Sequence, residues 1–229
     1  MHILAIIQAR MSSKRFPGKT LYRVKDRPML QYLLERVECC NSINDIVVAT
    51  SVEESDLPVE IFCQNYGVKC YRGSLNDVAG RFDDILTHYP CDAFVRVNGD
   101  SPLMDPKLID DGVGLFCSGD YDLVTNVSPR SFPKGQSIEV LKSNIYRKAY
   151  SGMRDHEELE HVTRYYYNHP DRFTIHNFTS QVDYSNIQLS VDTCTDMVNF
   201  ERIINCMDRP HWEYSWGDIM SLMKTVQID

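Results

Sequence analysis

Short apolar runs alternate with helix-like patterns through the first half of the chain. The runs hold four or five residues each, which is typical of strands buried on both faces of a sheet. We expect strands at 3–7, 46–49, 68–71 and 93–97, and helices over 28–40, 55–66, 76–88 (with Asn76 or Ser74 as its cap) and from 106 onward. Because strands and helices alternate along the chain, the pattern predicts an α/β fold with a mostly parallel sheet and helices on both faces.

The second half of the chain is less regular. Weaker patterns predict strands near 122–127, 137–141, 172–178 and 187–191, and helices near 143–151, 156–168, 195–206 and 216–225. No repeat or linker divides the sequence, so we expect a single domain over residues 1–229. A small region around 128–185 is expected to protrude from it and to serve acceptor binding or dimer formation.

Composition and charge narrow the classes of function. The 229 residues are 43% hydrophobic and 24% charged, and the net charge of −8 argues against a general nucleic-acid binder. No apolar run approaches the roughly 18 residues of a membrane-spanning helix, and the run at 3–7 is too short for a signal peptide. We therefore predict a cytoplasmic protein without a membrane partner. Its eight cysteines include no C-x-x-C pair and are expected to be free thiols.

A basic loop follows the first predicted strand. Residues 8–19, QARMSSKRFPGK, carry four cations within an acidic protein, at the strand end where parallel sheets bind their ligands. Arginine side chains and successive backbone N–H groups suit phosphate oxygens, so the loop predicts a polyphosphate site. It matches neither the P-loop pattern nor the G-x-G-x-x-G pattern. The alternative is a loop whose charges are simply solvated.

Two aspartates follow predicted strands in the same way. Asp100 comes after the strand at 93–97, within NGDSP, and Asp192 follows the expected strand at 187–191. Carboxylates from two strand ends can converge on one cation, and Mg²⁺ prefers such oxygens together with phosphates and water. Taken alone, however, Asp100 is as typical of a turn and Asp192 of a helix cap.

Six segments in order carry a resemblance to a known family. They are IQARM at 7–11, SKRFPGK at 13–19, RGSLNDVAGR at 72–81, RVNGDSPL at 96–103, EHVT at 160–163 and LSVDT at 189–193. Together they resemble the sugar-activating nucleotidyltransferases of the spore coat polysaccharide (SpsF) type, which are related to CMP-Kdo and CMP-sialic acid synthetases. The resemblance spans residues 3 to about 200 and implies a Rossmann-like, GT-A-like nucleotidyltransferase fold. Ser12 stands where the loop usually has glycine, which leaves the set of phosphate donors open.

The resemblance also assigns roles to the candidate residues. Arg10, Arg15, Lys19 and Asp100 would act in catalysis, and Asp100 and Asp192 would hold Mg²⁺. The nucleotide-binding candidates are Gln8, Ala9, Arg10, Met11, Ser12, Ser13, Arg15, Lys19, Thr50, Arg72, Gly73, Ser74, Asp77, Asn98 and Gly99. The acceptor-binding candidates are Lys134, Glu139, Glu160 and His161. For Ser74 and Asp77 a capped helix start is the alternative, and for the acceptor candidates a turn, an edge-strand charge and a solvated helix face.

These roles imply a cytidylyltransferase that joins CTP to a small, acidic, sugar-like acceptor and releases pyrophosphate, for surface polysaccharide synthesis. The related synthetases imply a homodimer. Guanylyl or other nucleotidylyl transfer to a sugar 1-phosphate or a phosphorylated or phosphonate acceptor stays open, because neither the base preference nor the acceptor can be derived from the residues. A GT-A glycosyltransferase is a further alternative, since Asp120-Tyr121-Asp122 matches the D-x-D metal pattern by letter.

Overall fold

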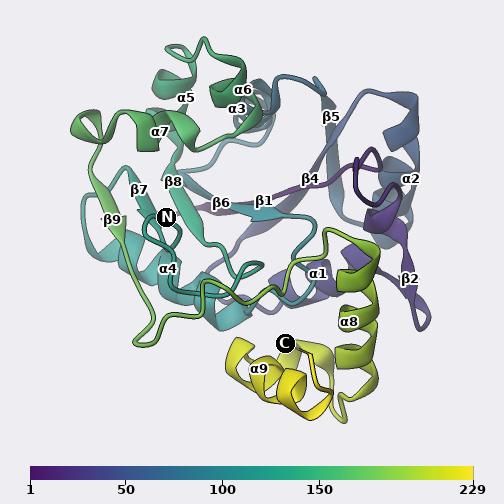
Figure 1. Ribbon diagram of the computed structural model, residues 1–229. Coiled ribbons are helices and arrows are strands. Elements are labelled where there is room, and N and C mark those ends of the chain that lie inside the picture. The colour runs from purple at the N-terminus through teal and green to yellow at the C-terminus, as the bar shows by residue number, and fades with distance from the viewer. Residues whose placement is uncertain (229) are drawn as a thin grey trace.

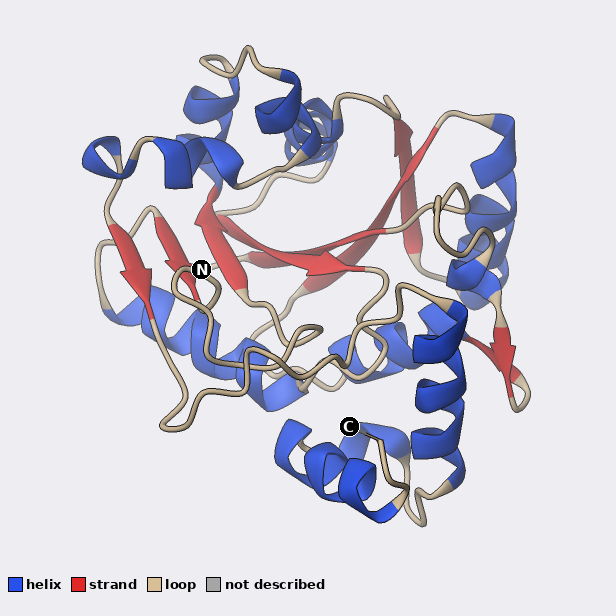
Figure 2. Ribbon diagram, in the orientation of Figure 1, coloured by secondary structure: helices blue, strands red, loops and turns tan. Residues whose placement is uncertain are grey.

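The protein is built around a seven-stranded sheet. The computed structural model describes residues 1–228 and orders the strands β5-β4-β1-β6-β8-β7-β9 (Figures 1 and 2). They are β1 (Ile3–Gln8), β4 (Asp45–Ser51), β5 (Lys69–Gly73), β6 (Ala93–Asn98), β7 (Leu123–Thr125), β8 (Glu139–Lys142) and β9 (Ile175–Asn177). Of these strands, β8 alone runs antiparallel to its neighbours, so the prediction of a mostly parallel sheet is confirmed.

Helices cover both faces of the sheet, as predicted. One layer holds α1 (Met29–Val37), α2 (Leu57–Tyr66) and α4 (Pro106–Ser118), and the other holds α3 (Val78–His88), α5 (Ser143–Tyr150), α6 (His156–Glu160) and α7 (Arg164–Asn168) (Figure 1). In β1, Ala5 and Ile7 pack on the first layer and Leu4 and Ile6 on the second. Because both faces of the strand are buried, its sequence is continuously apolar.

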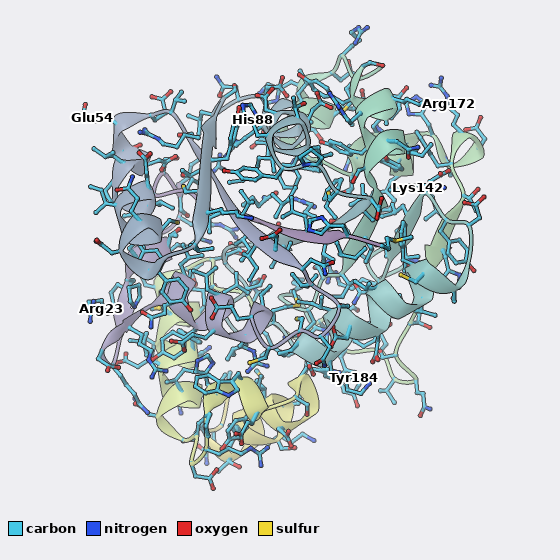
Figure 3. All side chains as sticks on the ribbon, turned by 180° about the vertical axis from the view of Figure 1, so that it is seen from behind. Arg23, Glu54, His88, Lys142, Arg172 and Tyr184 are labelled. Carbon is cyan, nitrogen blue, oxygen red and sulfur yellow. The ribbon has the colours of Figure 1, made fainter. Side chains whose placement is uncertain are left out.

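A third hydrophobic cluster joins the C-terminal helices to the start of the chain. Side chains of α8 (Cys194–Asn205) and α9 (Trp216–Thr225) pack with Met29 and Tyr32 of α1 and with Val24 of a small hairpin, β2 (Arg23–Val24) and β3 (Arg27–Pro28). This hairpin lies at the far end of the molecule from β9, as the positions of Arg23 and Arg172 show in Figure 3. Within residues 1–228 no helix is long and apolar enough to cross a membrane. The eight cysteines are free thiols, as expected.

Two predictions in the first half of the chain were wrong in detail. Residues 9–27 are not all loop, because they contain the 3₁₀ helix Lys19–Leu21 and the strands of the β2–β3 hairpin. The cap of α3 is neither Ser74 nor Asn76 but Asp77, whose Oδ1 accepts a hydrogen bond from the Gly80 N–H at 2.7 Å. Ser74 instead accepts from the N–H of Asp77, at 3.0 Å, and so holds the capping residue.

Two predicted elements in the second half were also wrong. Residues 187–191 are extended but belong to no strand of the sheet, because their backbone bonds to Lys134 and Asp100 rather than to a strand. The helix expected over 156–168 is split into α6 and α7, with His161 in an extended conformation at φ −112° and ψ 90°. Residues 128–185, expected to protrude, supply β8 and β9 to the sheet and α5, α6 and α7 to its cover. Their role in dimer formation stays a prediction.

A fully buried arginine fastens the C-terminal segment to α1. The Nε of Arg36 donates to the carbonyl of Met104 at 2.5 Å, and its terminal nitrogens donate to the carbonyls of His211 and Tyr214. Burial lowers the pKa of Arg36 to about 10, so the side chain stays charged at neutral pH. Two backbone segments far apart in the sequence, at residue 104 and at 211–214, therefore share one cation.

Arg36→Met should lower the free energy of unfolding by about 3 kcal/mol or more, because three buried carbonyls lose their donor. Urea denaturation followed by circular dichroism measures the change. Arg147→Met is the matched control: Arg147 lies in α5, about half of its side chain is exposed and it pairs with Asp83, so the loss there should stay below about 1 kcal/mol. Equal losses in the two variants would contradict the role of Arg36.

Candidate active site

A cleft of about 450 Å³ opens at the carboxyl edge of the sheet, beyond the ends of β1 and β6. Its lining includes the basic loop, residues 98–100 at the end of β6, Glu160 and His161 at the end of α6, and Asp192. Gln8 and Asn98 are register partners in the sheet, so the two segments that follow them start side by side. Parallel strands thus bring the basic loop and Asp100 together, as predicted.

The basic loop is held in a defined conformation. Gly18 adopts a left-handed φ of 78° and donates its N–H to the carbonyl of Met11 at 2.9 Å, which closes the loop on itself. The Met11 N–H donates to Asp56 Oδ1 at 2.7 Å. Asp56 is fully buried, and sequence analysis missed its role because its partner lies 45 residues away. Within residues 1–228, positive φ outside glycine occurs only at Lys25 and Gln227, so Ser12 fits this loop without backbone strain.

The two aspartates converge on a single ammonium group. Lys19 Nζ lies 3.4 Å from Asp100 Oδ2 and 3.1 Å from Asp192 Oδ1, and it donates to the carbonyl of Val191 at 2.6 Å. Arg15 adds a second cation, 2.8 Å from Asp192 Oδ1. The Val191 N–H donates to the carbonyl of Asp100 at 2.8 Å, so the segments that carry the two carboxylates are also joined through their backbones. The cap of α8 is Thr193, not Asp192, whose carboxylate therefore stays in the cleft.

The carboxylates of Asp100 and Asp192 fit a metal ion that takes most of its ligands from phosphates and water. Among the described residues no group of three or more His, Cys, Asp or Glu side chains could hold a metal by itself. The two convergent carboxylates are each about one quarter to one third exposed, and they offer hard oxygens at one point. The ammonium group of Lys19 contacts both of them there. Mg²⁺ is commonly bound by one or two carboxylates, with phosphates and water completing its shell.

Several predicted nucleotide-binding residues do not line this cleft. Arg72 donates to the carbonyls of residues 51–53 and pairs with Glu60 at 2.9 Å, so its charge serves the local fold. Thr50 is fully buried, and Asp77 caps α3. The other predicted residues outside the lining are Met11, Ser12, Gly73 and Ser74. From this part of the chain the cleft receives Val78 and Arg81 instead.

A second cleft of about 210 Å³ adjoins the first and shares Asn98 and His161 with it. Because β8 runs antiparallel to β6, its first residue, Glu139, lies beside Arg96, and the two side chains pair at 2.6 Å. The hydroxyl of Tyr167 donates to the other oxygen of Glu139 at 2.7 Å. Glu139 and His161 line this cleft and Glu160 lines the first, whereas Lys134 lines neither and bonds through its backbone to the 187–190 segment.

Sequence analysis missed the arginines of the second cleft. Arg96, Arg130 and Arg164 line it, and the Nη1 of Arg130 is buried without a hydrogen-bond partner. The Nη2 of Arg130 donates to Ser137 Oγ at 2.9 Å, and burial lowers the pKa of its guanidinium. A charged residue inside the apolar strand AFVRVN was the available signal for Arg96. Arg130 gave no such signal, because it lies in an irregular segment.

Comparisons with known proteins agree with this architecture. The family model described as cytidylyltransferase matches residues 4–205. The spore coat polysaccharide biosynthesis protein SpsF of Bacillus subtilis is 33% identical over 181 residues, which are 76% of this chain and 73% of that protein. A 3-deoxy-manno-octulosonate cytidylyltransferase of Bdellovibrio bacteriovorus is 30% identical over 62% of this chain and 57% of its own length. The solved structure of a cytidylyltransferase from Leptospira borgpetersenii superposes with a TM-score of 0.94 at 31% identity, covering 99% of this chain and 95% of that one.

Gly99→Ala should disturb the site through the backbone. A Cβ at this position would lie 2.7 Å from the carbonyl oxygen of Gln8, so the ends of β1 and β6 would have to separate. We expect a loss of about 1–3 kcal/mol in the free energy of unfolding, together with weaker nucleotide binding. Gly114→Ala in α4 is the control, because nothing lies within 4 Å of its added Cβ, and it should be neutral or stabilising by up to about 1 kcal/mol. Urea denaturation and calorimetric titration with CTP measure both effects, and a neutral Gly99→Ala would contradict the close approach.

Proposed function

The chain belongs to the cytidylyltransferase family, and from this premise we propose that it transfers CMP from CTP to a hydroxyl of an acidic sugar and releases pyrophosphate. The observation that carries the proposal is the joining of two clefts at one edge of the sheet. One is rich in phosphate-binding cations and contains two convergent carboxylates, and the other is lined by arginines. Asn98 and His161 lie where they meet, so two substrates can be held side by side.

The first cleft suits the triphosphate. Attack of an acceptor oxygen on the α-phosphate forms a new P–O bond and breaks the bond to pyrophosphate, which leaves with the added negative charge. Arg10 and Arg15 can donate to the departing oxygens, and their contacts strengthen as that charge develops. Lys19 fixes the separation of Asp100 and Asp192 and so orients both carboxylates toward the nucleotide. Asp100 and Asp192 would hold Mg²⁺, which when bound neutralises charge on the phosphates.

The second cleft suits an anionic acceptor. Its lining includes Arg96, Arg130 and Arg164 against one carboxylate, Glu139, whose charge Arg96 already balances. The buried, unpartnered Nη1 of Arg130 is a donor that a carboxylate of the acceptor would satisfy. The names of the relatives from Bdellovibrio bacteriovorus and Bacillus subtilis, an octulosonate cytidylyltransferase and a spore coat polysaccharide protein, are in keeping with an acidic sugar destined for a surface polysaccharide.

The D-x-D pattern that suggested a glycosyltransferase lies outside both clefts. Asp120 is almost fully exposed and pairs with Lys142 at 2.9 Å, and Asp122 accepts a hydrogen bond from the Thr174 N–H. Neither aspartate lines either cleft, so the D-x-D letters mark no metal site there. A sugar 1-phosphate is also an anion and remains an alternative acceptor that the following screen separates. Assembly as a homodimer is part of the proposal and is measured by sedimentation equilibrium.

The experiment that tests the function is a screen for pyrophosphate release. Each of the four nucleoside triphosphates is combined with Mg²⁺ and with a panel of 2-keto sugar acids, sugar 1-phosphates, phosphonates and neutral sugars. We expect release with CTP and an acidic acceptor, and CTP should raise the melting temperature more than the other triphosphates do. Release with GTP in preference to CTP, or with neutral sugars in preference to acids, would overturn the proposal.

Asp100→Asn should reduce turnover by about 10³-fold or more, because it removes one negative oxygen from the convergent pair and keeps the side-chain volume. Asp111→Asn is the control: Asp111 pairs with the exposed Lys107 on the surface of α4, outside both clefts, and turnover should not change. Pyrophosphate release at saturating Mg²⁺ measures both variants. Near-normal turnover of folded Asp100→Asn would remove this carboxylate from the reaction.

Arg130→Met should raise the KM for the acidic acceptor by about 10-fold or more and leave the affinity for CTP nearly unchanged. The reason is that Arg130 lines the second cleft and not the first. Steady-state kinetics with the acceptor selected in the screen gives the first number, and calorimetric titration with CTP the second. A loss of CTP affinity equal to the loss for the acceptor would assign Arg130 to the nucleotide instead.

A further inference from the structure

One buried cation of the first cleft has no ion-pair partner among residues 1–228. Arg81 lies in the first turn of α3, is only 3% exposed and lines the cleft. Its Nε is buried without a hydrogen-bond acceptor. Among residues 1–228 no carboxylate oxygen lies within 4 Å of its guanidinium nitrogens, so it forms no ion pair there. A charge that is buried without a partner lowers the stability of the fold, so the presence of Arg81 here needs a physical reason.

Two other cations of the cleft, and the buried Arg36, have partners of a kind that Arg81 lacks. Lys19 and Arg15 pair with Asp192, and Lys19 also pairs with Asp100. Arg36, which is also buried, donates to three backbone carbonyls and thereby serves the fold. Burial lowers the pKa of Arg81 to about 10, so its guanidinium remains charged at neutral pH without either kind of partner.

The charges around Arg81 indicate which kind of ligand would bind it. Asp56 attracts it from a distance, but the carboxylate of Asp56 is already bonded to the Met11 N–H and the Ser51 hydroxyl. Arg10 and Arg81 both line this cleft, and the charge of Arg10 contributes to the lowered pKa of Arg81. Within residues 1–228 neither arginine is paired to a carboxylate, so together they suit a strongly negative group, and phosphate oxygens match their planar donors.

We propose that Arg81 is a further phosphate-binding residue of this cleft and acts with Arg10 on the polyphosphate of the bound nucleotide. The proposal rests on the proposed function for the identity of that nucleotide, but not for the anion site itself. Phosphate oxygens would accept hydrogen bonds from the guanidinium donors that have no acceptor within residues 1–228. Because the site is buried, each of these hydrogen bonds is stronger than it would be in water. Gly73 makes room for this residue: a Cβ on Gly73 would lie 2.9 Å from Arg81 Cγ. The glycine of the RGS segment thus contributes to the site indirectly.

Calorimetric titration of Arg81→Met with inorganic pyrophosphate, CTP and cytidine tests the proposal. We expect the affinities for pyrophosphate and CTP to fall about 10- to 100-fold, and the affinity for cytidine to stay unchanged. Arg147→Met is the matched control, since it removes an exposed arginine outside the cleft and should change none of the three. Arg81→Gln is measured beside Arg81→Met, so that a folding defect of one variant, detected by circular dichroism, leaves the other to decide.

The outcomes separate this inference from the proposed function. Unchanged pyrophosphate binding in folded Arg81 variants overturns it, and a loss confined to cytidine overturns it too by assigning Arg81 to the base or ribose. If the wild type binds pyrophosphate but does not prefer CTP to the other triphosphates, the proposed function fails. The pyrophosphate titrations still decide the role of Arg81 in that case.

Discussion

The ammonium group of Lys19 is the point on which the arrangement of the site depends. It contacts Asp100 after β6, Asp192 before α8 and the carbonyl of Val191, and Lys19 itself ends the basic loop after β1. Two carboxylates this close would repel each other without a cation between them. Lys19 therefore holds the two carboxylates at a fixed separation. It also prevents the loop from swinging away from the sheet, so the cleft is organised before any ligand arrives.

The topology of the sheet decides how the two clefts meet. β1 and β6 are parallel neighbours, so the basic loop and the 98–100 segment leave the sheet at one edge. β8 then pairs antiparallel with β6 and brings its starting residue, Glu139, to the same edge beside Arg96. The break between α6 and α7 places His161 over the junction, where it lines both clefts. A continuous helix would have kept His161 in helical register and could not have turned the chain there.

Buried arginines in this protein differ by their partners rather than by their burial. Arg36 donates to the carbonyl of Met104, just before α4, and to the carbonyls of His211 and Tyr214. The protein itself therefore supplies its acceptors. Arg81 is nearly as buried, yet it lines the first cleft and its Nε has no acceptor. The cost of burying a charge is the same in kind at both positions. Only the first is compensated by the protein, which distinguishes a structural cation from one that a ligand completes.

The sequence by itself determined the strands of the first half, the parallel sheet, the basic loop and the two carboxylates. Each of these depends on local signals: apolar runs, turn residues and charges adjacent to a strand end. It did not determine that residues 187–191 bond to Lys134 and Asp100 instead of joining the sheet, or that the helix after residue 156 breaks at His161. Nor did it separate Arg72, which bonds to nearby carbonyls and Glu60, from Arg81 and Arg130, each of which has one buried nitrogen without an acceptor. Those outcomes depend on which partner each group meets across long stretches of chain, and only the tertiary structure decides that, because a buried polar group takes whatever acceptor the packing brings to it.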